Sequence, residues 1–307
     1  MASVIRLGTR SSTLALTQSG HVADSLRALG HAVELVPMLS PGDMTTTPLT
    51  GLAQEGIFVS SVREALLNNE IDIAVHSFKD VPTDVAEGIA LGAVPQRVDP
   101  RDTFISNYAS LGQLPAGARV GTCSARRAAW VLRKRPDVQV VPIRGNIDNR
   151  IAAMRSGEFD AIILAAAGVI RLGRQGDIVE YIDLSELVPA PAQGALAIEC
   201  RADDEEIETV LHQLTHEPSR QAALLERSIF HRIDATDSTA FGVLVEVGES
   251  AVRVFADISQ ADGSDRYVCE HVATFTDAAD RDAAMKSLED VVVSELLEHR
   301  TELVQVG

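Results

Sequence analysis

Short apolar runs alternate with segments of helical spacing along most of the chain. The apolar runs lie at residues 4–8, 33–38, 71–75, 89–94, 138–143, 160–164 and 195–200. Between them, apolar residues recur every three or four positions, as in 14–29 and 58–67, which predicts helices. Strands that alternate with helices indicate an α/β fold with largely parallel sheets. A crossover near 95–100 divides this pattern into two units.

The pattern changes after Gly242. Helical spacing at 203–215 and 217–232 is followed by strand-like runs at 243–247, 252–258 and 267–275, and then by a helical pattern near 279–297. Strands that follow one another without intervening helices are typical of antiparallel sheets. The last part of the chain is therefore predicted to be a small α+β domain.

One predicted strand leads directly into a polar turn. The apolar run Ile71–Val75 is followed by His76-Ser77-Phe78-Lys79-Asp80, and Lys79 is one of only three lysines among the 27 Lys and Arg residues. Open α/β sheets place their chemistry at the carboxyl ends of strands, so this turn is a candidate active site. The alternative is that Asp80 caps the next helix and Lys79 is simply solvated.

Several predicted strands also end in turns that carry arginine. Guanidinium groups bind carboxylates and phosphates in a bidentate manner, and two lobes with facing strand ends would form a cationic cleft. Such a cluster stands out in a chain with a net charge of −17. The alternative is a set of solvated surface arginines. The arginines concerned are Arg10, Arg126, Arg127, Arg144, Arg150 and Arg171.

Composition excludes several other classes of protein. The net charge of −17 disfavours nucleic-acid binding, and the apolar runs are too short to span a membrane. The first residues lack the pattern of a secretory signal, which predicts a cytoplasmic protein. The three cysteines form no CxxC pair, so neither a disulfide framework nor a zinc site is expected. His212 and His216 have helical spacing but no glutamate between them as in a zinc protease, and are expected to be a surface pair.

Seven segments together resemble one enzyme family. They read LGTRSSTLALTQ, GIFVSSVREALLNNEIDIAVHSFKDVPT, RDTFIS, GTCSARR, VPIRGNIDNR, AAAGVIRLG and PAPAQGALAIECR. In this order they are similar to porphobilinogen deaminases, also called hydroxymethylbilane synthases. The resemblance implies a monomeric transferase of tetrapyrrole biosynthesis that joins four porphobilinogen molecules on a bound dipyrromethane cofactor, releases ammonia at each step and needs no metal.

The resemblance also implies roles for individual residues. Asp80 corresponds to the catalytic carboxylate, which would stabilise the azafulvenium cation left by loss of ammonia and shuttle protons. Gln193 would line the hinge between lobes. The acetate and propionate of each pyrrole would be held by Arg10, Ser12, Lys79, Arg126, Arg127, Arg144, Arg150 and Arg171.

The implied fold has two lobes like those of periplasmic binding proteins and a small third domain. The first lobe is expected to comprise residues 1–96 with a return segment at 195–212, and the second to comprise 100–190. Residues 217–307 would form the α+β domain that normally carries the cofactor.

Two positions depart from the family pattern. Asp237 stands where the family has the cysteine that forms a thioether to the cofactor, and Glu55 replaces a lysine. A carboxylate is a poorer nucleophile than a thiolate, and its pyrrolylmethyl ester would ionise readily. Three alternatives follow: an enzyme whose primer is held non-covalently or by Asp237, an enzyme that uses another cysteine, or a homologue that binds porphobilinogen or bilane carboxylates without full turnover.

Overall fold

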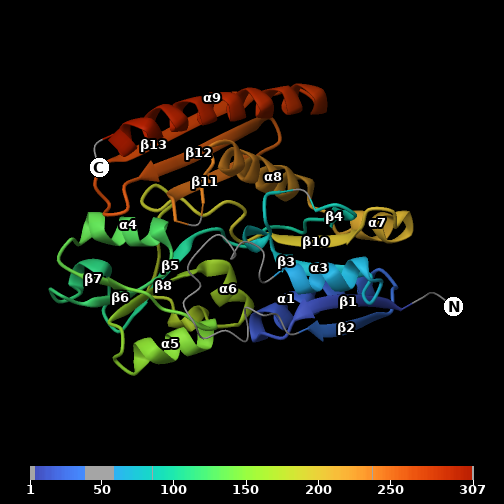
Figure 1. Ribbon diagram of the computed structural model, residues 1–307, viewed down its shortest axis with the longest axis horizontal. Helices are drawn as coiled ribbons and strands as arrows, with labels where there is room; N and C mark the ends of the chain where they lie inside the picture. The colour runs from blue at the N-terminus through green and yellow to red at the C-terminus, as the bar shows by residue number, and fades with distance from the viewer. Residues whose placement is uncertain (1–3, 39–58, 85, 237, 306–307) are drawn as a thin grey trace. The chain divides into compact units, whose positions relative to one another are not determined.

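A computed structural model describes residues 4–38, 59–84, 86–236 and 238–305 (Figure 1). The chain divides into two compact units, of which the first comprises residues 1–98 and 194–220 and the second comprises 99–193 and 221–307. The division of the second unit into separate domains at 100–190 and 217–307 stays a prediction.

The first unit is built on a five-stranded sheet with the order β2-β1-β3-β10-β4. β1 pairs in parallel with β2 and β3, whereas β10 runs antiparallel to its neighbours β3 and β4. β10 therefore completes this sheet although it follows β4 by about a hundred residues. The elements of this unit are β1 (Ile5–Arg10), α1 (Thr13–Ala28), β2 (Val33–Met38), α3 (Ser60–Leu67), β3 (Ile73–Ser77), the 3-10 turn η1 (Phe78–Asp80), β4 (Ile89–Ala93), β10 (Leu196–Arg201) and α7 (Glu205–His212).

The second unit contains a five-stranded sheet with the order β7-β6-β8-β5-β9. Here β6 pairs in parallel with β7 and β8, and β5 runs antiparallel to β8. Its elements are β5 (Asp102–Ser106), η2 (Leu111–Gln113), β6 (Arg119–Gly121), α4 (Ala125–Lys134), β7 (Gln139–Val141), α5 (Ile147–Arg155), β8 (Ala161–Ala165), α6 (Ala166–Arg171), η3 (Gln175–Asp177) and β9 (Glu180–Tyr181).

The two five-stranded sheets share one topological plan. In each sheet, the fourth strand in spatial order, β10 or β5, runs antiparallel to the third. That strand is also the first one formed after the chain passes into the unit from the other unit. This plan confirms the predicted α/β fold with two similar lobes. β5 and β9 were not predicted, since five residues of RDTFIS and the two-residue β9 carry little periodicity of their own.

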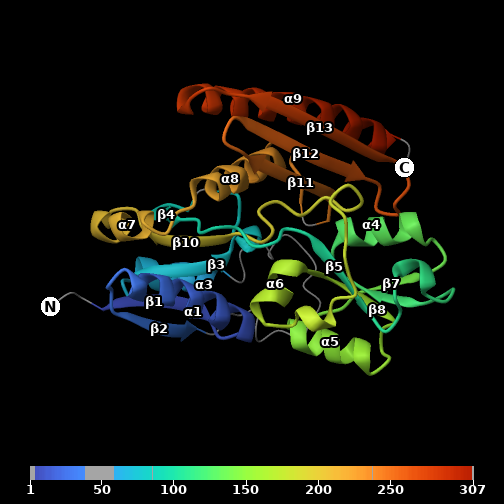
Figure 2. The same cartoon turned by 180° about the vertical axis from the view of Figure 1, so that it is seen from behind.

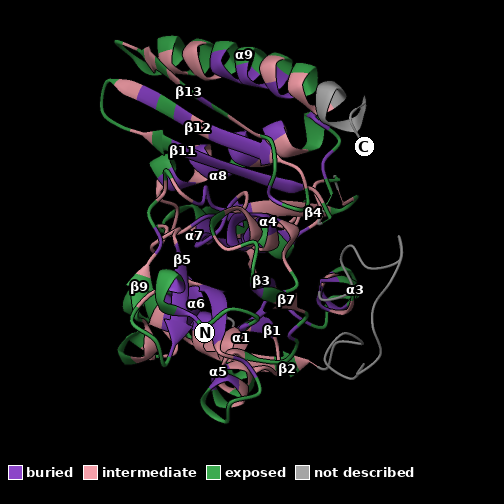
Figure 3. Ribbon diagram, turned by 90° about the vertical axis from the view of Figure 1, so that its left-hand side faces the viewer, coloured by how far each residue is buried: buried purple, intermediate pink, exposed green. Residues whose placement is uncertain are grey.

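A three-stranded antiparallel sheet completes the second unit. β11 (Ala240–Val247), β12 (Ala251–Ser259) and β13 (Arg266–Thr274) pair in that order, with α8 (Glu217–Arg232) and α9 (Ala278–Gln305) as the associated helices. Figure 2 shows α9 lying along this sheet, and Figure 3 shows how much of β12 is buried. Both helices share one apolar core with the inner face of the sheet, which includes Ile229, Val254 and Val292. The predicted α+β character of this segment is confirmed.

Two further predictions concern this fold. The strand that leads to the candidate turn was expected to end at Val75, but β3 continues through Ser77. The extension arises because His76 and Ser77 pair with Ala197 and Leu196 of β10. Among the described residues, no helix combines the length and apolar character needed to cross a membrane.

Candidate functional site

The turn after β3 places Lys79 and Asp80 in solvent. Phe78 is buried, and its backbone N–H donates a hydrogen bond of 3.0 Å to the Ala195 carbonyl. Val81 is buried on the other side of the turn, so the two residues between these anchors are exposed. Buried apolar anchors on both sides fix a short loop and hold its polar tip outward.

Asp80 does not cap a helix. It is the last residue of η1, and the following residue Val81 has extended backbone angles. Among the described residues that follow, the next regular element is the strand β4. Within the described part of the chain, the Asp80 side chain has no hydrogen bond or ion pair. Its carboxylate is therefore exposed to solvent, and the capping alternative is excluded.

Arg10 and Ser12 follow the same edge of the sheet as this turn. β1 and β3 are parallel neighbours, with Gly8 opposite Ala74, so both strands end on the same side. Ser12 is the N-cap of α1, and its Oγ accepts a hydrogen bond of 3.3 Å from the Ala15 N–H. The first unit thus brings Arg10, Ser12, Lys79 and Asp80 to one edge, as parallel strand ends require.

A buried charged group lies behind the turn. Glu199 on β10 accepts hydrogen bonds of 2.9 and 2.6 Å from the Arg63 guanidinium, and its Oε2 lies 3.5 Å from His76 Nε2. Burial alone would raise the pKa of Glu199, but the bonds from Arg63 and the proximity of His76 lower it to about 2. His76 lies near the end of β3, four residues before Asp80, so this buried ion pair lies next to the base of the candidate turn.

In the second unit, Arg126 and Arg127 share one buried carboxylate. Arg126 Nη2 lies 2.6 Å from Asp102 Oδ2, and Arg127 Nη2 lies 2.7 Å from Asp102 Oδ1. Asp102 is fully buried, and both guanidinium groups also donate to backbone carbonyls, those of Val188 and Ile163. One carboxylate between two guanidiniums leaves a net positive charge at the start of α4.

Three more cationic or nucleophilic groups lie near this pair. Burial lowers the pKa of Arg150, and the positive charges of Arg127 and Arg144 lower it further, whereas Cys123 acts in the opposite direction. Arg150 Nε donates a bond of 2.7 Å to the Gly145 carbonyl, while Arg144 and Cys123 are exposed. Guanidinium groups that repel one another in a partly desolvated site are stabilised by a bound anion.

Arg171 and Gln193 lie in different parts of the second unit, the first at the end of a helix and the second in the buried interior. Arg171 ends α6, the helix that follows β8, and burial lowers its pKa to about 10. Gln193 is fully buried, and its Nε2 donates bonds of 2.8 Å to the Pro100 carbonyl and 3.1 Å to Asp102 Oδ1. The amide thus ties the chain near residue 193 to the crossover at Pro100. Its role as a residue that contacts substrate stays a prediction.

Asp237 and Glu55 lie outside the described residues. The three cysteines differ in access, since Cys123 is exposed and Cys200 and Cys269 are buried. Burial raises the pKa of Cys200 to about 11 and that of Cys269 to about 12. Of these thiols, only Cys123 is both exposed and close to the arginine cluster.

Two carboxylates of these networks were not predicted as functional residues. Asp102 is the first residue of the strand DTFIS, and Glu199 lies inside LAIECR, which is otherwise mostly apolar. An acidic residue within a buried strand needs a cation close by, so the isolation of Glu199 among apolar neighbours was a usable signal. Its partners were not predictable, because Arg63 and Arg126 come from helices distant in the sequence.

Taken separately, the first unit is an α/β lobe with an exposed carboxylate after a strand, and the second is an α/β lobe with clustered guanidiniums after its strands. The sequence matches the family model "Porphobilinogen deaminase, dipyromethane cofactor binding domain" over residues 5–209. The chain belongs to the porphobilinogen deaminase family.

Individual relatives match over nearly the whole chain. The porphobilinogen deaminase of Thermobifida fusca is 43% identical over 299 residues, which cover 95% of this chain and 93% of that protein. The porphobilinogen deaminase of Mycobacterium avium is 42% identical over 272 residues, or 85% of this chain and 86% of that protein. Both alignments therefore continue past residue 209, where the match to the family model ends.

Among solved structures, the chain is similar to two substrate-binding proteins. The methionine binding protein MetQ has 15% identity and a TM-score of 0.45 over 73% of this chain and 93% of that chain. A periplasmic substrate-binding protein of an ABC transporter from Coxiella burnetii has 15% identity and a TM-score of 0.44, over 73% and 95%.

The residues of the second unit fit the dipyrromethane group. Two pyrrole rings with an acetate and a propionate each present four carboxylates, which need several cationic partners. Arg150 and Arg171 have pKa values lowered by burial, and a carboxylate would restore the stability of their charged forms. Arg126 Nε is buried and has no hydrogen-bond partner among the described residues. The donor set therefore matches a polycarboxylate.

Proposed function

We propose that this chain is a hydroxymethylbilane synthase that condenses four porphobilinogen molecules into linear hydroxymethylbilane for tetrapyrrole biosynthesis. The observation that carries the proposal is the match to the porphobilinogen deaminase family model over residues 5–209, a range that includes the exposed Asp80 turn. The fit of the arginine cluster to pyrrole carboxylates supports it.

Each condensation exchanges one bond for another. The C–N bond of the substrate aminomethyl group breaks, and ammonia leaves with the bonding electron pair. A ring carbon of a second pyrrole then attacks the remaining methylene carbon to form a carbon–carbon bond, and that ring carbon loses its proton, which ammonia takes up. The net products are one new carbon–carbon bond and one ammonium ion. Dipyrromethane, when bound, supplies the first pyrrole nucleophile.

We assign the central role in this chemistry to Asp80. Loss of ammonia leaves a delocalised azafulvenium cation, and a fixed carboxylate stabilises positive charge that develops in the transition state. The same carboxylate can accept and return the protons that move in each cycle. Asp80 suits these tasks because its side chain is exposed at the end of η1, between the buried residues Phe78 and Val81.

The arginine set is proposed to orient the substrate. Arg127, Arg144 and Arg150 would bind acetate and propionate groups, with Arg171 and Arg126 completing the set. Arg10, Ser12 and Lys79 are proposed to do the same beside Asp80. Charge-assisted hydrogen bonds of this kind contribute roughly 1.5–3 kcal/mol each, so several of them suffice to retain a growing chain between steps.

Activity is tested with purified protein and porphobilinogen. The proposal predicts ammonia release above the spontaneous rate and a product that oxidises to a uroporphyrin chromophore. Binding of porphobilinogen without ammonia release would instead identify a homologue without full turnover, and would contradict the proposal.

The attachment of dipyrromethane is a separate question, for which the intact mass under denaturing conditions is the measurement. A mass excess equal to the cofactor on a peptide with Cys123 or Asp237 identifies a covalent site. An unmodified mass in an active preparation identifies non-covalent retention.

We also propose, from the family resemblance, a cytoplasmic monomer that binds neither nucleic acid nor membranes, and light scattering coupled to size exclusion tests its mass in solution.

A further inference from the structure

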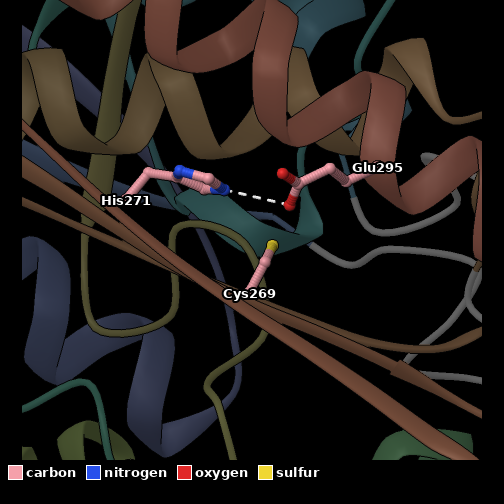
Figure 4. A group of neighbouring side chains, drawn as sticks. All are labelled: Cys269, His271 and Glu295. Atoms are coloured by element: carbon pink, nitrogen blue, oxygen red, sulfur yellow. Dashed lines mark hydrogen bonds and ion pairs between the residues drawn. The ribbon is translucent and has the colours of Figure 1, made fainter.

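Three side chains of metal-ligand type meet between the small sheet and its covering helix. They are Cys269 and His271 on β13 and Glu295 on α9 (Figure 4). One ligand atom from each, a sulfur, a ring nitrogen and a carboxylate oxygen, lies within 4.8 Å of the other two. This cluster belongs to the second unit and shares no residue with the proposed site.

The alternation of β13 explains why these residues converge. Tyr267, Cys269 and His271 are spaced by two and therefore face the same side of the strand. α9 packs against that side, since Val292 and Leu296 share a core with Cys269. Glu295 lies beside Leu296 on the same helix and so reaches the polar row of the strand.

We propose that Cys269, His271 and Glu295 bind a divalent cation that favours sulfur and nitrogen ligands, of which Zn²⁺ is the natural example. Zn²⁺ takes Cys, His and carboxylate ligands at about 2.0–2.3 Å in tetrahedral geometry, which places ligand atoms roughly 3.3–3.7 Å apart. His271 Nε2 and Glu295 Oε2 lie 2.9 Å apart, and all three ligand atoms lie within 4.8 Å of one another, so small side-chain shifts bring them to this geometry.

Two of the three ligands are accessible to solvent. Cys269 is buried, whereas the side chains of His271 and Glu295 are 29% and 34% exposed. The thiol therefore forms the floor of the site, and the other two ligands lie toward solvent, where water can complete the tetrahedron. Binding exchanges the thiol proton for a metal–sulfur bond, so one proton is released for each cation bound.

The same residues already interact without a cation. His271 and Tyr267 each lie 2.9 Å from the same Glu295 oxygen, and the Tyr267 ring stacks on that of His299. A gain in stability on metal addition is therefore insufficient to establish the site. The decisive observation is a metal–sulfur bond to Cys269.

Co²⁺ is the probe, because it reports both thiolate ligation and tetrahedral geometry by absorption. Full-length protein, freed of metal by dialysis against chelator, is titrated with Co²⁺ and then with Zn²⁺. We expect one Co²⁺ per chain, a near-ultraviolet thiolate charge-transfer band, and loss of this band when Zn²⁺ displaces Co²⁺. Carboxylates of a bound pyrrole group give no such band.

Variants identify the ligands. Cys269→Ser should abolish the band, and His271→Gln, at a partly exposed position that tolerates polar change, should weaken Co²⁺ binding at least tenfold. His212→Gln and Cys123→Ser are the matched controls on exposed residues and should bind as the wild type does. Absence of the band in folded wild-type protein, its persistence in Cys269→Ser, or its loss in Cys123→Ser would overturn the proposal.

Discussion

The carboxylate of Asp102 lies 2.6 Å from the Arg126 guanidinium, and both groups are buried. Arg127 binds the other oxygen of the same carboxylate. The arginines at the start of α4 are thus held in place by a fixed anion before any substrate arrives. Such preorganisation reduces the entropy that is lost when a ligand binds.

Removal of this anion should destabilise the protein strongly. Asp102→Asn leaves two buried guanidiniums without a counter-charge, and breaking a buried ion pair costs about 3–5 kcal/mol. Urea unfolding followed by circular dichroism measures the loss. Asp137→Asn, which removes an exposed partner of Arg135, is the control and should leave the midpoint nearly unchanged. Equal midpoints for both variants would contradict the structural role of Asp102.

Glu199 predicts a pH dependence of stability. Its pKa is lowered to about 2 from an ordinary value of 4.5, so the folded state binds its proton less readily than the unfolded state. The carboxylate therefore stabilises the fold above pH 4.5, and this contribution falls as pH drops toward 2, by roughly 1.4 kcal/mol for each pH unit.

The test compares the wild type with Glu199→Gln in urea at pH 7, 5, 4 and 3.5. The variant should be less stable at pH 7, and the difference between the two proteins should shrink below pH 4.5. A difference in stability that stays constant over this range would show that the ion pair with Arg63 does not lower the pKa of Glu199.

The three thiols should react at very different rates. Cys123 is exposed, whereas Cys200 and Cys269 are buried with pKa values raised by burial to about 11 and 12. Because the thiolate is the reactive form, a colorimetric disulfide reagent at pH 8 should modify one thiol rapidly and the others only on unfolding. Cys123→Ser should remove the fast phase. A fast phase of two or three thiols would contradict the burial of Cys200 and Cys269.

Gly242 should not tolerate a side chain. A Cβ at this position would lie 2.4 Å from the Val188 carbonyl oxygen, a backbone atom that cannot move aside easily. Gly242→Ala should therefore cost about 1–3 kcal/mol through overpacking. Gly20→Ala is the opposite case, because no atom lies within 4 Å and the position is inside α1, so it should stabilise by about 0.5–1 kcal/mol. Thermal unfolding distinguishes the two, and equal effects would contradict the packing around Gly242.

The local sequence pattern predicted most elements because each lobe repeats strand, turn and helix with clear periodicity. It placed Asp80 in a turn after a strand but ended that strand at Val75, since the pairing of His76 and Ser77 with β10 depends on residues far along the chain. For the same reason it found Arg126 and Arg127 but not their partner Asp102. The cluster of Cys269, His271 and Glu295 has no sequence motif, because strand spacing and a distant helix jointly create it.

We have assigned to Asp80 the role of catalytic carboxylate in a hydroxymethylbilane synthase. The most direct test measures the rate of porphobilinogen consumption by Asp80→Asn against Asp84→Asn, an exposed aspartate of the same segment. We expect Asp80→Asn to lower kcat by at least about 100-fold with an unchanged unfolding midpoint, because an amide carries no charge to stabilise the cation. Asp84→Asn should retain wild-type turnover. Wild-type turnover in Asp80→Asn would show that Asp80 is not the catalytic carboxylate.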